Sequence, residues 1–325
     1  MNLFDLHCDT AGECYLQGKP LYKNDLHVSV CKAKNLYKWA QIFAIWIPDE
    51  KRGPAAEEYF DCVCANFLKE VEKNSDKIIL CRTAEDMDNA FTNGRCAALL
   101  SVEGASAALG KERLQRLKRI GVKLITLTWN GNNEIADGCF GDNGGLTAYG
   151  REYIDELSRL NIVADVSHIG KKGFWQVAEN SALSVVASHS CASKLLESCA
   201  PFKGKENAIR RNLDDEQIKA LAGRESLIGI NFCSRFLGGK GNDGFDAVYR
   251  HMSRILDLGG KNVLALGSDF DGCEINPDLA GVDKMPALAE YLSARGFSDE
   301  LVENIFFNNA YNFFKNILQK EKSVL

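Results

Sequence analysis

Short apolar runs alternate with amphipathic segments along most of the chain. Eight of these runs are rich in Val, Ile, Leu and Ala, which is typical of strands buried on both faces. The predicted strands are NLFDLHCD (2–9), WAQIFAIWI (39–47), CAALLSVEG (96–104), VKLITLTW (122–129), IVADVSH (162–168), SVVASHS (184–190), LIGINFC (227–233) and NVLALGSDF (262–270).

The amphipathic segments between these runs carry helix start and stop signals. The segment 54–74 starts with Pro, 147–161 with Thr, and 214–223 with two acids before ending at Gly. A C-terminal helix is predicted over 298–318, where Ser298 is followed by two acids. The runs 78–80 and 84–91 predict an additional strand and helix between the second and third main strands.

Eight strands separated by helices predict a (β/α)₈ barrel, and without an interdomain linker we expect one domain over 1–325. A doubly wound open sheet is the alternative. That fold favours a Gly-rich phosphate loop after the first strand, whereas HCDTAGEC (7–14) follows here. The barrel is therefore the preferred prediction.

The composition excludes several classes of partner. The chain has 325 residues, 46% hydrophobic and 26% charged, with a net charge of −5, which does not favour nucleic acid or an anionic membrane. No basic leader and no apolar run of about 18 residues is present, so we expect a cytoplasmic protein without a membrane anchor. Several of the twelve cysteines lie in apolar runs, as Cys96 and Cys233 do, which predicts free thiols.

Polar side chains stand where the apolar strands end. In a barrel of this kind the carboxyl ends of the strands form one rim, and that rim carries the active site. The residues at these ends are His7 and Asp9, Glu103, Trp129 and Asn130, His168, His189, and Asp269.

His7 and Asp9 are two positions apart, so both side chains point to the same face of a strand. Their Cβ atoms should lie about 6–7 Å apart, and the two side chains can reach one ion. Three of the five histidines lie at strand ends. For the other two, His27 and His251, we expect a surface or capping role.

Three imidazoles and two carboxylates exceed the usual ligand number of one zinc ion. They divide well between two ions that share a bridging carboxylate and a bridging hydroxide. Zinc suits this ligand set best, and Mn²⁺, Co²⁺ or Fe²⁺ would also fit. Asp269 and Asp271 both follow the eighth strand, and their spacing alone does not decide which one acts.

Seven motifs occur in one order along nearly the whole chain. They are DLHCDT (5–10), LLSVEGA (99–105), LTWNGNN (127–133), ADVSHIG (164–170), ASHSCA (187–192), RRNLDDEQI (210–218) and GSDFDG (267–272). The chain thereby resembles the membrane (renal-type) dipeptidase family, the M19 metallopeptidases, which are amidohydrolase-like barrels.

This resemblance implies roles for individual residues. His7 and Asp9 would hold one zinc, His168 and His189 the second, and Glu103 would bridge them. Arg211 would bind the free carboxylate of a dipeptide, since its planar fork matches a carboxylate.

The resemblance also implies the reaction, which is hydrolysis of dipeptides, with tolerance for a D-residue at the C-terminal position. Asp269 would accept the proton of the attacking water and pass it to the leaving amine. A homodimer is expected on the same ground.

One position departs from the family pattern. Many members carry His where this chain has Trp129, and that His is thought to stabilise the tetrahedral oxyanion. The role could pass to Trp129, to Asn130 or to the metals, or the substrate range could differ. The loops expected to set this range are 10–38, 130–146 and 234–244.

Three alternatives remain beside the dipeptidase. Another binuclear amidohydrolase could act on a cyclic amide or a lactone, but such barrels often bridge their metals with a carboxylated lysine on strand four. Here the only lysine of that strand, Lys123, stands near its start. The others are a non-enzymatic metal-binding barrel and a metal-free sugar-phosphate barrel, for which GGKGNDG (238–244) is a weak phosphate signature.

Overall fold

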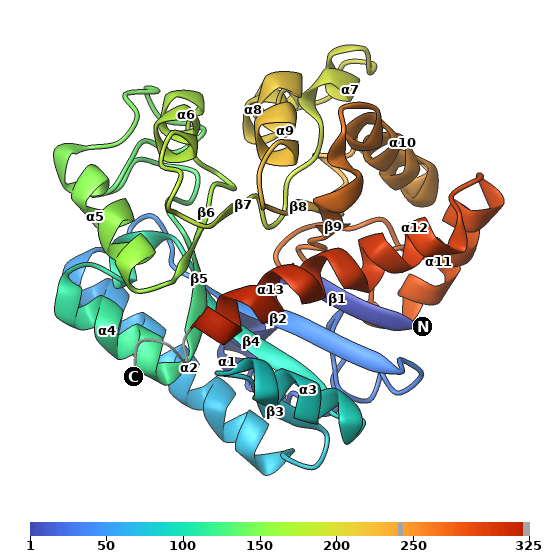
Figure 1. The fold of residues 1–325 in the computed structure, drawn as a ribbon, viewed down its shortest axis with the longest axis horizontal. Helices are drawn as coiled ribbons and strands as arrows, with labels where there is room; N and C mark the ends of the chain where they lie inside the picture. The colour runs from blue at the N-terminus through green and yellow to red at the C-terminus, as the bar shows by residue number, and fades with distance from the viewer. Residues whose placement is uncertain (240–242, 321–325) are drawn as a thin grey trace.

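The computed structural model describes residues 1–239 and 243–320. It confirms the predicted (β/α)₈ barrel: parallel strands form a ring surrounded by helices (Figure 1). The ring order is β7-β6-β5-β4-β2-β1-β9-β8, and a parallel bridge between Ala187 and Ile228 joins its two ends. The strands are β1 (Asn2–Cys8), β2 (Lys38–Trp46), β4 (Cys96–Glu103), β5 (Val122–Thr126), β6 (Val163–Asp165), β7 (Val185–Val186), β8 (Ile228–Ile230) and β9 (Leu264–Leu266).

The later strands are shorter than predicted, because their polar ends turn out of the ladder. His168 and Asp269 have φ angles of 67° and 59°, a left-handed conformation that a strand cannot contain. β3 (Ile78–Leu80) pairs with β4 outside the ring, and α3 (Ala84–Thr92) follows it behind a capping box of Thr83 and Asp86. This pair confirms the predicted insertion.

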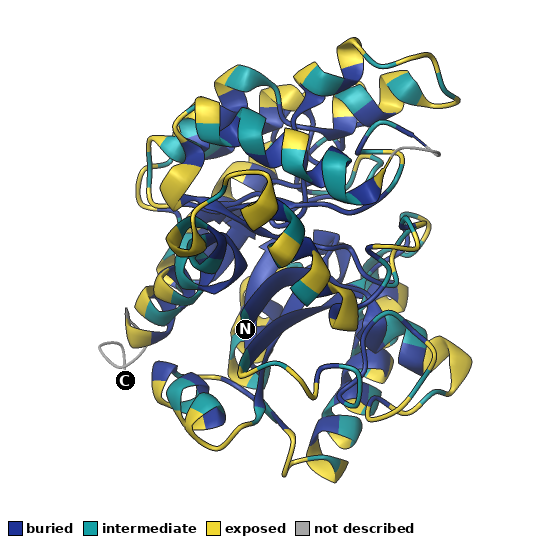
Figure 2. Cartoon of the chain, turned by 90° about the vertical axis from the view of Figure 1, so that its right-hand side faces the viewer, coloured by how far each residue is buried: buried dark blue, intermediate teal, exposed yellow. Residues whose placement is uncertain are grey.

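Helices cover the outside of the ring, with their exposed faces outward and the strands buried between them (Figure 2). They are α1 (Thr10–Gln17), α2 (Gly53–Lys73), α4 (Lys111–Ile120), α5 (Ala148–Arg159), α6 (Lys171–Ala178), α7 (Ser193–Glu197), α8 (Lys205–Arg211), α9 (Asp215–Ala222), α10 (Gly244–Asp257), α11 (Met285–Ala294), α12 (Asp299–Glu303) and α13 (Asn309–Lys320). Three short 3₁₀ turns span Ala105–Ala107, Gly260–Asn262 and Val282–Lys284.

Two predicted segments differ from the structure. The stretch 10–38, expected as a loop, starts with α1. The predicted helix 298–318 is divided into α12, a π-helical turn (Asn304–Asn308) and α13, and Ser298 caps its start as expected. Residues 240–242 of the predicted loop 234–244, and the end of the chain after Lys320, lie outside the described residues.

The last helix closes one end of the ring. α13 crosses the strands in Figure 1, and its side chains pack with apolar residues from the first halves of the strands. Phe314 stacks on Phe4 with ring centroids 5.5 Å apart. The amino end of the barrel is therefore filled with apolar side chains, which leaves the carboxyl end for polar groups.

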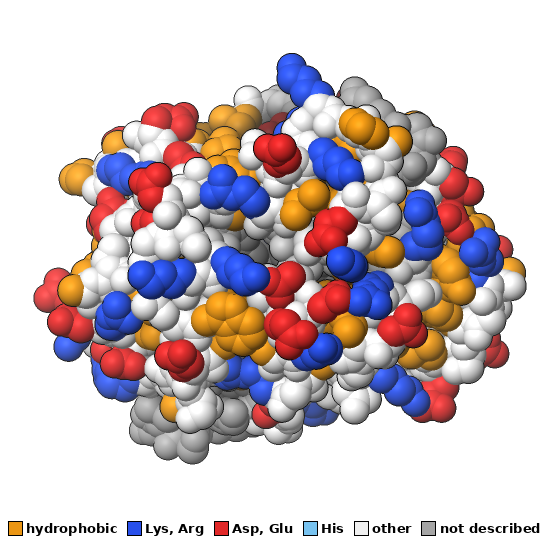
Figure 3. Space-filling view, turned by 90° about the horizontal axis from the view of Figure 1, so that it is seen from above, with side chains coloured by type: hydrophobic (Ala, Val, Ile, Leu, Met, Phe, Trp, Pro, Cys, Tyr) orange, Lys and Arg blue, Asp and Glu red, His pale blue; other side chains and the backbone are white. Residues whose placement is uncertain are grey.

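Several composition-based expectations can be compared with the structure. All twelve cysteines carry free thiols, as predicted. Among the described residues, no helix combines the length and the apolarity needed to span a bilayer. Basic and acidic side chains are interspersed on the face shown in Figure 3.

Candidate metal centre

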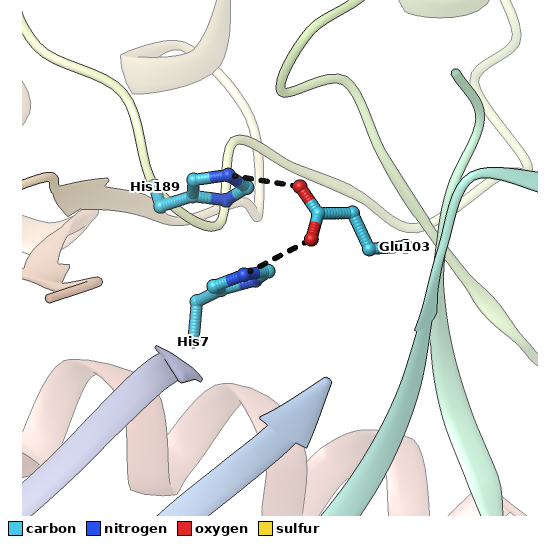
Figure 4. Close-up of side chains that lie close together, drawn as sticks. All are labelled: His7, Glu103 and His189. Atoms are coloured by element: carbon cyan, nitrogen blue, oxygen red, sulfur yellow. Dashed lines mark ion pairs between the residues drawn. The ribbon is translucent and has the colours of Figure 1, made fainter. Parts of the chain in front are cut away.

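The carboxyl ends of four strands bring one glutamate and three histidines together. His7 lies at the end of β1 and Glu103 ends β4, while His168 and His189 follow β6 and β7. All four are buried, with at most 6% of each residue exposed. Figure 4 shows Glu103 reaching between His7 and His189. The structure thus brings together residues far apart in the sequence, as expected.

The two carboxylate oxygens of Glu103 face different histidines. Oε2 lies 3.4 Å from Nε2 of His7. Oε1 lies 3.1 Å from Nε2 of His168 and 3.5 Å from Nε2 of His189. A carboxylate placed in this way can join two cation positions, one on the side of each oxygen.

Two more carboxylates approach His7. Its Nε2 lies 3.3 Å from Oδ2 of Asp9 and 4.0 Å from Oδ1 of Asp269. Gly272 allows this crowding, because a Cβ there would lie 2.1 Å from Oδ2 of Asp9 and 2.5 Å from Oδ1 of Asp269. Only a residue without a side chain fits beside the two acids.

The donor atoms fit divalent cations. Within residues 1–239 and 243–320, neither buried ring nitrogen of His7 has a hydrogen-bond partner, which is costly unless another group satisfies them. Nε2 of His168 and Nε2 of His189 lie only 3.0 Å apart. Two sets of ligand atoms converge within 4.8 Å, His7 with Glu103 and His189, and His7 with Asp9 and Asp269. Buried imidazoles that converge with carboxylates match the preferences of zinc and similar metals.

The charges of the site depend strongly on one another. Burial alone would raise the pKa of Glu103, but the charge of His7, the largest opposing effect, lowers it well below its usual value. Burial alone would lower the pKa of His7, but Glu103 and Asp9 raise it well above the ordinary value. In the absence of a metal, a proton on His7 therefore partly compensates the buried acids.

The pKa values of Asp269 and Asp9 are raised, unlike that of Glu103, and the pKa of His168 is lowered, unlike that of His7. Burial, with the charge of Asp9, raises the pKa of Asp269 to about 7, and burial with the charge of Glu103 raises the pKa of Asp9 to about 6. Burial, with the charge of Arg211, lowers the pKa of His168 to about 4. Neutral imidazoles beside crowded carboxylates are the state in which these groups bind a metal.

Trp129 and Asn130 lie beside His168. The Nδ1–H of His168 donates to the amide oxygen of Asn130 at 2.9 Å, which turns Nε2 toward Glu103. The ring of Trp129 lies 6.4 Å from the ring of His168 and 5.0 Å, edge-on, from that of Trp46. Asn130 thus orients a candidate ligand, and Trp129 forms part of a wall of two indoles next to it.

Arg211 lies near the predicted ligands. Its guanidinium donates to the backbone oxygen of His189 and to Oγ of Ser190, both at 2.9 Å. Its buried Nε–H has no partner in the part of the chain that the structure describes. Arg211 also lines a pocket of about 480 Å³ together with Cys139 and Ile169. Arg211 is thus held by its neighbours beside His189 and borders a pocket.

The structure separates Asp269 from Asp271. Oδ2 of Asp269 accepts a hydrogen bond from the Asn231 amide at 3.0 Å, while Oδ1 faces His7. Asp271 instead accepts hydrogen bonds from the backbone of His27 at 2.6 Å and the hydroxyl of Thr10 at 2.5 Å. Asp271 therefore fixes a loop, and Asp269 faces the ligands.

His27 and His251 lie outside the ligand set, and of the two expected roles, surface or capping, His251 has the second. His251 is 1% exposed, and its Nδ1 accepts from the backbone N–H of Ala192, the N-cap residue directly before α7. His27 is half-buried, and its Nδ1 accepts from the backbone of Asp271 at 3.0 Å. Both histidines thus satisfy backbone donors.

Sequence reasoning missed a set of buried polar residues behind the site. Asn231 holds Asp269, and Asp5 and Asp165 bind serines that directly precede Asp269 and His189. The available signal was a polar residue inside an apolar strand, as in FDLH, ADVSH and GINF.

Comparisons with known proteins agree over nearly the whole chain. The family model for membrane dipeptidase, peptidase family M19, matches residues 1–324. An uncharacterized protein in the pqqA 5′ region of Klebsiella pneumoniae is 30% identical over 262 residues, which cover 77% of this chain and 93% of that protein.

Two solved structures superpose closely. The dipeptidase AC, a metallopeptidase of family M19, has a TM-score of 0.85 at 25% identity, over 97% of this chain and 98% of the other. A metallopeptidase from Rhodobacter sphaeroides, liganded with a phosphinate mimic of the dipeptide L-Ala-D-Ala, has a TM-score of 0.85 at 24% identity. The match covers 97% of this chain and 99% of the other.

Proposed function

Because the chain belongs to the membrane dipeptidase family, peptidase family M19, and is therefore a metal-dependent dipeptidase, we propose that it works with two Zn²⁺ ions. The observation that carries this proposal is the division of the Glu103 carboxylate between His7 and the pair His168 and His189. Asp9 completes the ligands on the side of His7. Mn²⁺, Co²⁺ or Fe²⁺ would satisfy the same donors.

Two cations at this site would lower the pKa of a water molecule and polarise the scissile carbonyl. Asp269 is the proposed proton carrier. Its Oδ2 is occupied by Asn231, so the open Oδ1 would take the proton of the attacking water and return it to the leaving amine. Burial raises its pKa in the metal-free protein, and two bound cations would lower that pKa again and favour the ionised form that accepts the proton.

Arg211 supports a substrate with a free C-terminal carboxylate. Its backbone and serine contacts hold the guanidinium in place, and its buried Nε–H remains available. The relative from R. sphaeroides binds a mimic of L-Ala-D-Ala, so we propose that a D-residue is accepted at the C-terminal position. Trp129 is proposed as a wall of the substrate site, where its indole N–H can also donate to the substrate.

Metal analysis joined to a hydrolysis panel tests this function. We expect about two zinc per chain and turnover of L-Ala-D-Ala and L-Ala-L-Ala. Glu103→Gln should abolish turnover and reduce the metal content. Glu156→Gln, which changes a buried glutamate paired with Arg159 on α5, should retain both and serves as the control.

The panel also contains dihydroorotate and a simple lactone, to test the alternative of a cyclic amide or lactone substrate. Lys123 is the second residue of β5 and lies at the end of the barrel opposite to the ligands, so a carboxylated lysine cannot bridge metals there. Turnover of the ring substrates alone would contradict the dipeptidase proposal.

The cytoplasmic location and the homodimer stay predictions. Cell fractionation tests the first, and light scattering of the purified protein tests the second.

A further inference from the structure

The buried carboxylate of Asp165 receives four hydrogen bonds. Oδ1 accepts from the backbone N–H of Ser167 and of Ser188, both at 2.9 Å. Oδ2 accepts from the hydroxyls of Thr126 and Ser188, both at 2.6 Å. Each oxygen thereby meets two donors, which uses the acceptor capacity of an ionised carboxylate. The hydroxyl hydrogen of Ser188 therefore points to Asp165.

The direction of this hydrogen bond determines the next one. Oγ of Ser188 lies 2.7 Å from Nδ1 of His189. Because the hydroxyl hydrogen is already donated to Asp165, Oγ can only accept, and Nδ1 of His189 must carry the proton. Ser167 Oγ is another neighbour of Ser188 Oγ, but at 3.4 Å it competes poorly with a charged acceptor at 2.6 Å.

The backbone around Ser188 is fixed by close packing. A Cβ added at Gly229 would lie 1.9 Å from the Ser188 carbonyl oxygen, and one at Gly267 would lie 1.8 Å from it. The two glycines thus let β8 and β9 approach Ser188 closely. Since Ser188 and His189 are completely buried, the hydroxyl has no water with which to exchange its partners.

We propose that Asp165 and Ser188 are positioning residues that hold His189 in its Nδ1–H tautomer. This tautomer leaves Nε2 free as a ligand, so the two residues set the affinity of the metal site that contains His189. This inference rests on the proposed metal-dependent function. It concerns two residues that touch neither the substrate nor a metal, and it agrees with the general role of hydrogen bonds behind metal-bound histidines.

The opposite side of the barrel offers an internal control. Oδ1 of Asp5 accepts from the backbone N–H of Ser268 at 2.8 Å, and Oδ2 accepts from its hydroxyl at 2.6 Å. Gln41 donates to Oδ2 at 2.7 Å, as Thr126 does on the other side. The Ser268 hydroxyl, however, contacts no imidazole in the described structure: its second acceptor is the backbone oxygen of His7.

The isosteric variant Asp165→Asn tests whether the hydrogen bonds from His189 to Ser188 and from Ser188 to Asp165 set the tautomer of His189. We expect its amide NH₂ to replace Oδ2 and to donate to the Ser188 hydroxyl. That hydroxyl would then donate to Nδ1 of His189, which moves the ring proton to Nε2. Asp5→Asn makes the same change beside Ser268, whose hydroxyl contacts no imidazole ring in the described structure.

Two measurements read out the result. In metal-free protein labelled with ¹⁵N-histidine, at a pH where the imidazole is neutral, NMR shifts distinguish Nδ1–H from Nε2–H. We expect Nδ1–H in the wild type and in Asp5→Asn, and Nε2–H in Asp165→Asn. Competition with a chromophoric chelator should show zinc affinity about 10–100-fold weaker in Asp165→Asn than in Asp5→Asn.

Ser188→Ala serves if Asp165→Asn does not fold, because it removes the hydroxyl and leaves the carboxylate. It should also weaken zinc binding relative to Asp5→Asn. An Nε2–H tautomer in the wild type, or equal zinc affinities in the variants and the control, would overturn the proposal. A wild type that has the Nδ1–H tautomer but binds no zinc would instead refute the proposed metal function. The claim about zinc affinity would then fail, while the claim that Asp165 and Ser188 set the tautomer of His189 would stand.

Discussion

The imidazole rings of His7 and His189 stack with their centroids 3.8 Å apart and their planes 23° apart. One ring lies at the end of β1 and the other follows β7. Two stacked imidazolium ions would repel each other, and burial, with the charges of His7 and Arg211, lowers the pKa of His189 well below its usual value. At most one ring of the pair is therefore an imidazolium ion, and the other is neutral with one ring nitrogen ready to bind a cation.

Asp269→Asn and Asp271→Asn should separate catalysis from loop stability. Asp269→Asn removes the proposed proton carrier, so kcat for L-Ala-D-Ala should fall about 10²–10⁴-fold while the metal content is retained. Asp271→Asn loses hydrogen bonds that fix residues 10 and 27–28, so it should lower the unfolding free energy by about 1–3 kcal/mol with unchanged kcat. Steady-state kinetics and urea denaturation measure the two effects, and a reversed pattern would assign the base to Asp271.

Arg211→Lys tests recognition of the substrate carboxylate. Lys keeps the charge but loses the planar fork, so KM for dipeptides should rise about 10–100-fold, in line with 1.5–3 kcal/mol for a charged hydrogen bond. Arg210→Lys, whose side chain donates to the Gly141 carbonyl on the surface, is the matched control. C-terminally amidated dipeptides should be poor substrates of the wild type, and Arg211→Lys should reduce this preference. Equal KM changes at both arginines would contradict the role of Arg211.

The repeating pattern of the chain was sufficient to predict the barrel and the position of the histidines, because parallel strands must end at one rim. It was not sufficient to predict the residues behind them. Asp165 and Asn231 look like ordinary polar interruptions of a strand, and their partners Ser188 and Asp269 become neighbours only through strand pairing. Long-range hydrogen bonds of this kind leave no periodic signal.

His251 shows a second limit of the sequence. Its polar neighbours Arg250 and Ser253 predict exposure, but the face of α10 on which it lies is turned inward, and a buried backbone N–H at Ala192 requires an acceptor there. Helical periodicity shows which face of α10 carries His251. It does not show that the backbone N–H of Ala192, from another part of the chain, makes a buried histidine favourable on that face.

His251 should make the protein sensitive to acid. Burial lowers its pKa to about 4 from an unfolded value of 6.5, so between these values the unfolded state binds more protons. The stability contributed by neutral His251 is complete above pH 6.5 and is lost as the pH falls toward 4. His251→Asn keeps an acceptor near Nδ1 but does not titrate.

The difference in unfolding free energy between metal-free wild type and metal-free His251→Asn therefore isolates this effect. We expect the wild type to lose about 3 kcal/mol more than the variant between pH 7 and pH 4. Urea denaturation across this range measures it, and parallel pH curves would refute the assignment.

Phe314→Ala tests the closure of the barrel by α13. Removal of a buried aromatic ring that stacks on Phe4 should lower the unfolding free energy by about 3–5 kcal/mol. Metal content and kcat should not change, because the ring lies at the end of the barrel away from the ligands. Tyr37→Ala, at a side chain that is 76% exposed, should change the stability by no more than about 0.5 kcal/mol. Loss of metal in folded Phe314→Ala would show that the two ends of the barrel are coupled.

The first and last strands of the ring, β1 and β9, are neighbours, and the backbone N–H of Asp269 donates there to the carbonyl of His7. During synthesis, His7 leaves the ribosome long before Asp269. A nascent or prematurely terminated chain is therefore an open sheet with two unpaired edges, a form prone to aggregation. The proposed ligands and the proposed proton carrier are present together only after Asp269 has been synthesised, so a chain that stops before this residue lacks part of the proposed site.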